Sequence, residues 1–133
     1  MGEEHSGVPE VNFELDRFEV LILRDGPRAG ELDQSIVKQL QAEHIRYLFG
    51  LQAAGKLLAA GAIENRSPDL RINGLGFFQL GSIEEVRQLA ERDPSVQAGL
   101  DSAEILVFIC PKGALAFPQA AGGPLDITNP GKN

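Results

Sequence analysis

Apolar positions recur at helical spacing in the stretch from residue 36 to residue 55. Successive members are separated by four, four, four and three residues, so their side chains share one face of a helix. The members of this stripe are Ile36, Leu40, His44, Leu48 and Leu51. The pattern therefore predicts an amphipathic helix whose apolar face carries one titratable side chain, the imidazole of His44.

Local signals mark the ends of two helices. Asp33 is expected to cap the first helix by accepting from backbone N–H groups of its first turn, and Gly55 is expected to end it in a left-handed conformation. Ser82 and Glu85 form a capping box that begins a second helix, SIEEVRQLAER. Pro94 ends that helix, because the residue before a proline is pushed out of the helical region. The next residues, PSVQAG, are interpreted as a polar turn.

Two stretches are apolar at consecutive positions, which is the pattern of a strand. They lie within RFEVLILR (17–24) and AEILVFIC (103–110). A strand with one face in water would alternate between apolar and polar residues, so both strands are predicted to be covered on both faces. Residues 56–64 and 74–80 form two shorter predicted strands, and Gly61 in the first of them indicates a bulge or a close approach to the backbone.

The predicted order is β-α-β-β-α-β, the ferredoxin-like α+β arrangement of a four-stranded antiparallel sheet with two helices on one face. Two helices cover only one face of such a sheet, and an uncovered apolar face promotes association. We therefore predict a homodimer whose subunits pack sheet to sheet. Residues 1–12 and 118–133 show no periodicity and are predicted to be flexible tails around a single domain, 13–117.

Composition narrows the classes of function. The chain of 133 residues has 19 acidic and 12 scattered basic side chains, a net charge of −7, which argues against a nucleic-acid partner. No apolar run approaches the roughly 20 residues of a membrane helix. The N-terminus has no signal-like apolar segment, and Cys110 is the single cysteine, so a cytoplasmic location is expected.

No metal or cofactor is expected. The second histidine, His5, lies in the predicted tail, and one cysteine provides no ligand spacing. The sequence GLG at 74–76 precedes a predicted strand, whereas a dinucleotide fingerprint follows a strand and begins a helix.

His44 has two interpretations that the residues alone leave open. A lone histidine on an apolar stripe more often packs than reacts, whereas a catalytic one usually has a second group that orients its ring. Asp93 is the candidate partner, because the two predicted helices lie side by side on the sheet. The alternative is that Asp93 bonds only nearby backbone. With no serine or reactive cysteine placed beside them, the pair would support proton transfer rather than acyl transfer.

Three further residues are candidates for contact with a small-molecule ligand. Arg24, at the end of the first strand, would meet an anionic ligand or would simply be a solvated strand end. Tyr47, three residues after His44, would border the same pocket or pack. Gly61 would allow a ligand to approach the backbone closely.

Several segments together resemble the YCII-related family, from about Phe18 to Phe117. They are EVLILRDGP, HIRYLFGLQAAGKLLAAGAI and GLGFFQLGSIEEVRQLAERDPSVQAGLDSAEILVF. The resemblance implies a dimeric α+β barrel and an active site with a histidine and an aspartate, which fall on His44 and Asp93. One relative is a dehydrochlorinase of a chlorinated hydroquinone, and the wider fold includes muconolactone isomerases. The chain departs from the family at Gly61-Ala62, where Gly-Pro is frequent, and at Val107-Phe108, where a Trp is frequent, so its pocket is expected to differ in shape.

The resulting hypothesis is a small cofactor-independent enzyme of the lyase or isomerase type. His44 would act as general acid and base and Asp93 as its orienting carboxylate, on a small cyclic or aromatic substrate that is uncharged or anionic. The competing hypothesis is a non-catalytic dimeric module that binds a small metabolite or a partner protein. The distance between His44 and Asp93 distinguishes the two.

Overall fold

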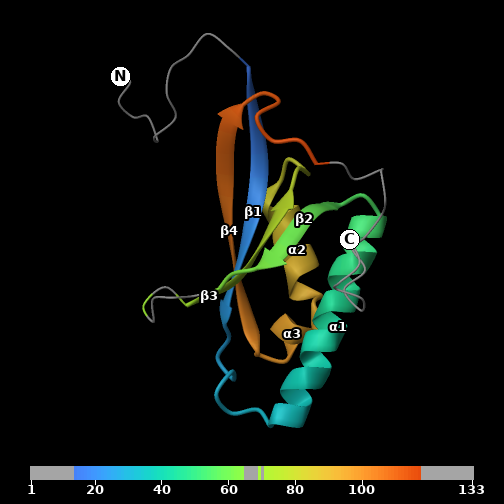
Figure 1. Ribbon diagram of the computed structural model, residues 1–133, viewed down its shortest axis with the longest axis vertical. Helices are drawn as coiled ribbons and strands as arrows, with labels where there is room; N and C mark the ends of the chain where they lie inside the picture. The colour runs from blue at the N-terminus through green and yellow to red at the C-terminus, as the bar shows by residue number, and fades with distance from the viewer. Residues whose placement is uncertain (1–13, 65–68, 70, 118–133) are drawn as a thin grey trace.

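The computed structural model describes residues 14–64, 69 and 71–117, in which a four-stranded antiparallel sheet is covered by helices (Figure 1). The elements follow the order β1 (Leu15–Asp25), α1 (Gln34–Ala53), β2 (Leu57–Ala62), β3 (Ile72–Phe78), α2 (Ile83–Glu91), α3 (Pro94–Gln97) and β4 (Asp101–Pro111). The strand order in the sheet is β2-β3-β1-β4. The predicted ferredoxin-like α+β fold is thereby confirmed.

The hydrophobic core lies between one face of the sheet and α2. Its buried members are Leu21, Leu23, Leu57, Phe78, Val86, Leu89 and Ala90. Helix α2 contacts β1 and β4, whereas α1 contacts β2 and α3 (Figure 1). The two long helices thus lie over different parts of the sheet, and α1 lies over the edge formed by β2. None of the helices in the described residues is long and apolar enough to span a membrane.

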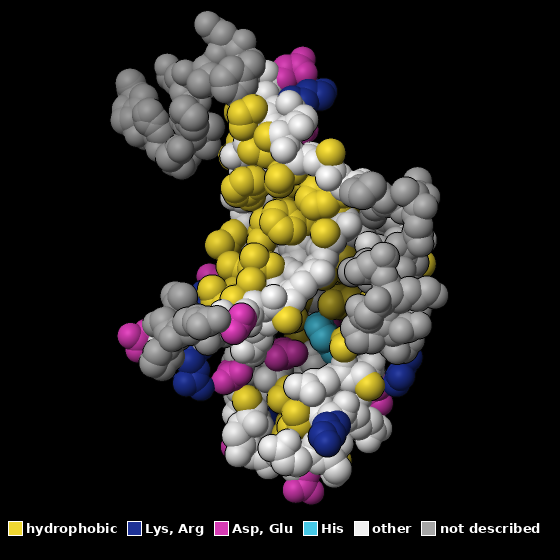
Figure 2. All heavy atoms as spheres, in the orientation of Figure 1, with side chains coloured by type: hydrophobic (Ala, Val, Ile, Leu, Met, Phe, Trp, Pro, Cys, Tyr) yellow, Lys and Arg dark blue, Asp and Glu magenta, His cyan; other side chains and the backbone are white. Residues whose placement is uncertain are grey.

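The opposite face of the sheet is also apolar. Residues 18–23 of β1 are all buried; because side chains alternate along a strand and Leu21 and Leu23 enter the core, their neighbours Val20 and Ile22 lie on the outer face. Phe108, which pairs with Phe18 in the next strand, is 44% exposed. Apolar side chains gather over the strands in Figure 2. The outer face of the single chain therefore carries uncovered apolar surface, as the sequence predicted.

Helix α1 has the predicted ends, with one difference in how its first turn is capped. Gly55 follows the helix with φ of +79°, and the N–H of Lys56 reaches back to the carbonyl of Leu51, which is the arrangement of a glycine stop. Asp33 is the N-cap residue, but its side chain makes no capping hydrogen bond. The predicted carboxylate cap is therefore wrong; the backbone carbonyl of Asp33 accepts the N–H of Val37 instead.

Three details of the other elements differ from the sequence prediction. The bulge in β2 lies between Leu57 and Ala59, not at Gly61. The stretch PSVQAG contains the short helix α3, which Pro94 begins and Asp93 caps; four residues are too few for periodicity to reveal. Strand β1 begins at Leu15, two residues before the predicted start. Phe117 packs on Phe18 and Phe77, with ring centroids 5.6 and 5.7 Å away. Both predicted tails lie outside the described residues.

Candidate active site

A cavity of about 740 Å³ separates α1 from the sheet. Its floor is formed by small residues of β2 and β3, which leave space where larger side chains would have filled it. These small lining residues are Ala59, Ala60, Gly61, Ala62, Gly74 and Gly76. Figure 2 shows a histidine side chain, in cyan, within a hollow and next to acidic side chains. This is His44, which lines the cavity from α1.

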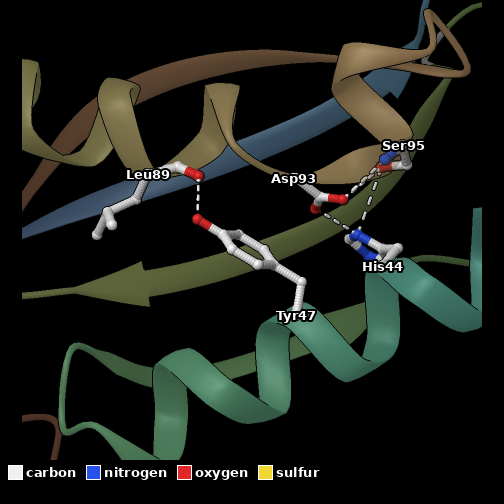
Figure 3. Close-up of polar contacts among 5 residues, drawn as sticks. All are labelled: His44, Tyr47, Leu89, Asp93 and Ser95. Atoms are coloured by element: carbon white, nitrogen blue, oxygen red, sulfur yellow. Dashed lines mark hydrogen bonds and ion pairs between the residues drawn. The ribbon is translucent and has the colours of Figure 1, made fainter.

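His44 and Asp93 are in direct contact. The Nδ1 atom of the imidazole lies 2.6 Å from Oδ2 of Asp93, and Figure 3 shows the two side chains meeting between α1 and the start of α3. The residue Asp93 is only 3% exposed. Its other oxygen, Oδ1, accepts the backbone N–H of Ser95 at 2.9 Å and the hydroxyl of Ser95 at 3.0 Å. Asp93 therefore caps α3 and holds the imidazole at the same time.

The electrostatic surroundings favour the charged imidazole. Burial alone lowers the pKa of His44, but the hydrogen bond and charge of Asp93, together with the charge of Asp101, raise this pKa above its usual range. In the neutral ring, the proton belongs on Nδ1, where Asp93 accepts it. The other ring nitrogen, Nε2, is then the basic atom that remains for a substrate.

Ser95 is a member of this cluster that the sequence analysis did not find. Its hydroxyl lies 3.5 Å from Nδ1 of His44 and is hydrogen-bonded to Asp93 (Figure 3). The residue has an exposed fraction of 0% and stands on the Asp93 side of the ring. It therefore orients the pair and is not placed to attack a ligand. The sequence did carry one signal for Ser95: it lies two positions after Asp93, and an aspartate N-cap accepts from the residue at that position.

Asp101, the first residue of β4, also lines the cavity and was missed from the sequence. Burial raises the pKa of Asp101, and the charge of Asp93 adds to this rise. The polar side chains of Ser95 and Asn73 and the charge of His44 lower the pKa of Asp101 without reversing this rise. No periodic pattern marks an aspartate at the start of a strand, so only the fold brings Asp101 to His44.

Asp25, at the end of β1, lies at another part of the cavity wall. Its carboxylate accepts from Asn73 Nδ2 at 2.9 Å and from the guanidinium of Arg71 at 3.1 Å. The hydrogen bonds from Asn73 and Arg71 lower the pKa of Asp25 and keep it ionised. Asn73 therefore connects Asp25 with Asp101.

The three residues predicted to contact a ligand occupy different places. Gly61 lines the cavity. Arg24 is not among the lining residues, and its Nε atom donates to Glu104 at 3.1 Å. Tyr47 does not line the cavity either; its hydroxyl donates to the carbonyl of Leu89 at 2.6 Å and so links α1 to α2 (Figure 3). Ligand contact by these residues stays a prediction, and the cavity supports it for Gly61.

In the part of the chain that the structure describes, no group of three or more His, Cys, Asp or Glu side chains is arranged to hold a metal ion. Cys110 is buried in β4 and is not among the cavity lining residues. The chemistry that the residues at hand can perform is proton transfer through His44.

Comparisons with known proteins give a family match and several similar solved structures. The sequence profile of the YCII-related domain matches residues 19–109. The chain is similar to 5-chloro-2-hydroxyhydroquinone dehydrochlorinase from Burkholderia phenoliruptrix AC1100, solved with 2,5-dihydroxybenzoquinone, at 22% identity and a TM-score of 0.46, over 68% of this chain and 90% of that one. It is also similar to hydroxynitrile lyase from Passiflora edulis, at 11% identity and a TM-score of 0.40, over 77% and 98% of the two chains. No curated protein sequence matches the chain. The family match includes His44, Asp93 and Asp101.

Proposed function

The chain belongs to the YCII-related domain family, and from this premise we propose that it is a small acid–base enzyme that needs no cofactor. In this proposal His44 is the general acid and base, and Asp93 is the positioning residue that orients it. The substrate is a small cyclic or aromatic molecule. The reaction is abstraction of a proton followed by elimination or isomerisation.

The observation that carries the proposal is the 2.6 Å contact between His44 Nδ1 and Asp93 Oδ2 in the wall of an open cavity. A histidine that merely packs needs no buried carboxylate held in place by two further hydrogen bonds. A binding module would be expected to keep the two side chains apart or to fill the cavity. The contact and the open cavity therefore favour the catalytic interpretation over the module.

The proposed step uses only the atoms described above. Nε2 of His44 takes a proton from a substrate carbon, and the electron pair of the broken C–H bond forms a new double bond. In an elimination, a leaving group departs with its own bonding pair; in an isomerisation, the imidazolium returns the proton to a different substrate atom. Asp93 stabilises the imidazolium while it exists. The step uses no covalent intermediate, and the described lining residues include no Ser, Thr, Cys or Lys side chain.

A proton-exchange assay tests the proposal before any natural substrate is identified. A panel of small cyclic ketones and phenols is incubated with the protein in D2O, and loss of C–H signals is followed by NMR. We expect faster exchange for at least one compound, and a loss of about 10²–10⁴-fold on His44→Gln, the contribution typical of a positioned acid–base group. The control is His5→Gln, the same substitution at the other histidine. Exchange that survives His44→Gln, or no accelerated exchange at all, would overturn the proposal.

We further propose that the protein is a homodimer that buries the outer face of the sheet. Leu106 and Phe108 of β4 are 48% and 44% exposed in the single chain and lie beside Val20 and Phe18 of β1. A contiguous apolar patch of this kind is typical of an interface between subunits. Packing the two sheets against each other would form the barrel that the sequence resemblance implies.

A further inference from the structure

We infer that the cavity selects a molecule with an apolar body and a hydrogen-bond-donating end, and that Asp101 excludes anionic ligands. The inference rests on the proposed function, because it names the class of substrate that His44 would meet. It narrows the sequence-level hypothesis, which allowed both uncharged and anionic substrates.

The charges around the cavity leave one carboxylate without a cationic partner of its own. His44 is bound to Asp93 at 2.6 Å, and Asp25 is paired with Arg71 at 3.1 Å. Apart from the imidazole and Asp93, the side chains that influence Asp101 are the neutral ones of Ser95 and Asn73, and the Ser95 hydroxyl donates to Asp93. The attraction of Asp101 to the imidazolium is shared with the nearer Asp93. The end of the cavity that Asp25, His44 and Asp101 line therefore carries an excess of negative charge.

The described lining residues provide no cationic group for an anion apart from His44. Neither lysine nor arginine is among them. Arg24, the residue that would have met an anion, donates to Glu104 instead. Ionised carboxylates accept hydrogen bonds and cannot donate them, so a ligand oxyanion beside Asp101 would face repulsion. The donors among the described lining residues are the imidazole of His44 and the neutral amides of Gln41, Gln52 and Asn73.

The remaining walls favour an apolar body. Leu48 and Phe49 face the cavity from α1, and Leu21 and Leu57 do so from the sheet. Between them, β2 and β3 contribute mainly alanine and glycine, so the floor is flat and the space of about 740 Å³ admits a ring. Apolar walls also reduce solvent screening. The charge of Asp101 therefore discriminates more strongly between neutral and anionic ligands.

A hydroxyl or amino group on such a ring would have a defined place. Asp101 would accept its hydrogen bond while the apolar part lies over the alanine and glycine floor. Since Asp101 and His44 line one cavity and interact electrostatically, a ring bound in this way would lie beside the imidazole. Asp101 is thus a specificity-determining residue in this account.

Three probes that differ only in their polar group test the inference on the full chain at pH 7. They are benzyl alcohol, benzylamine and benzoate, and binding is followed through the NMR signals of the His44 ring. For ligands of this size we expect dissociation constants of about 1–10 mM for benzyl alcohol and benzylamine. Benzoate is expected to bind more weakly by about tenfold or more, which corresponds to about 1.4 kcal/mol. Benzoate that binds as tightly as benzyl alcohol, or a failure of all three probes to bind, would overturn the inference.

A variant tests whether Asp101 is the residue that selects against anionic ligands. Asp101→Asn keeps the size of the side chain and removes its charge, so the difference between benzoate and benzyl alcohol should shrink several-fold. Asp33→Asn is the matched control, because Asp33 is exposed and does not line the cavity. An unchanged ratio in Asp101→Asn would contradict the role of Asp101, and the wild-type series decides the selectivity even if this variant fails to fold. Tight binding of benzoate would leave the exchange assay on His44 unaffected, so the two proposals can fail separately.

Discussion

The two carboxylate oxygens of Asp93 bind different partners, one with a structural role and one with a chemical role. Oδ1 holds the first turn of α3 through the backbone and hydroxyl of Ser95, and Oδ2 holds the imidazole of His44. Because the same buried carboxylate does both, the position of the ring is fixed by the fold and not by the rotamer of an exposed side chain. At the scale of single residues, this fixed position of the ring makes His44, a histidine on the apolar face of a helix, a candidate base.

The pair also makes stability depend on pH in a defined direction. The pKa of His44 is raised in the folded chain by the contact with Asp93, which outweighs the opposing effect of burial. The resulting stabilisation is complete below the unfolded pKa of about 6.5 and is lost as the pH rises through the folded pKa. Urea unfolding of the wild type and of His44→Gln should therefore show a larger difference in free energy of unfolding at acidic than at alkaline pH. A difference that grows toward alkaline pH, measured against His5→Gln as the control, would contradict this sign.

The sequence indicated His44 and Asp93 as site residues, but it did not indicate Ser95 and Asp101 beside them. His44 stands on a long periodic helix and Asp93 stands before a proline, so both were marked by local signals. Ser95 is marked only by its spacing two positions after Asp93, and Asp101 has no local signal, because only the fold brings the start of β4 near His44 of α1. The same limit applies to Arg24, which pairs across strands with Glu104.

At the scale of elements, the link between β1 and α1 supports the start of β4. The N–H of Gly26 donates to the carbonyl of Leu100, and that of Arg28 donates to the carbonyl of Gly99, both at 2.8 Å. The backbone comes so close here that a Cβ atom on Gly26 would lie 2.3 Å from the Gly99 oxygen. This contact holds the residues immediately before Asp101, and therefore a wall of the cavity.

Replacing Gly26 with alanine should move that wall. The added methyl group meets backbone atoms, which cannot rotate away, so we expect Gly26→Ala to lower the free energy of unfolding by about 1–3 kcal/mol, the usual cost of overpacking. Gly30→Ala is the matched control, because a Cβ atom there meets nothing within 4 Å. Its effect should stay within about 0.5 kcal/mol. Equal effects of the two substitutions in chemical denaturation would show that the close contact does not matter.

The elements themselves were largely predictable, and the cavity was not. Apolar periodicity and glycine and proline signals predicted the four strands and the two long helices. The open space depends on the distance between α1 and the sheet, which follows from small residues on β2 and β3 such as Gly74 and Gly76. Small side chains leave no periodic signal of their own, so the sequence did not indicate this space. The short helix α3 was missed for the related reason that four residues show no period.

At the scale of the whole molecule, the two faces of the sheet have different tasks. One face packs on α2 and lines the cavity under α1, and the other presents apolar side chains to the outside. The catalytic proposal concerns the first face and the homodimer concerns the second. A subunit could therefore lose its partner and keep the contact between His44 and Asp93.

The association state tests the role proposed for the outer face. Sedimentation velocity should give about twice the chain mass of 14.3 kDa for the wild type. Phe108→Glu should shift the protein to the monomer, because the interface would then bury an unpaired charge. The matched control is Ile36→Glu, which puts the same charge on α1 at a residue that is 43% exposed. A monomeric wild type, or a Phe108→Glu variant that stays dimeric, would contradict the proposed interface.

If Asp93 holds His44 as a base, the contact between them must be visible in an NMR titration of the histidine ring. Both histidines, His44 and His5, are assigned through their Gln variants, and His5 serves as the reference within the same sample. We expect His44 to titrate above about 6.5, with its neutral proton on Nδ1, and Asp93→Asn to lower the pKa of His44 while Asp33→Asn leaves it unchanged. A His44 that titrates at or below about 6.5, or one whose pKa does not respond to Asp93→Asn, would contradict the account.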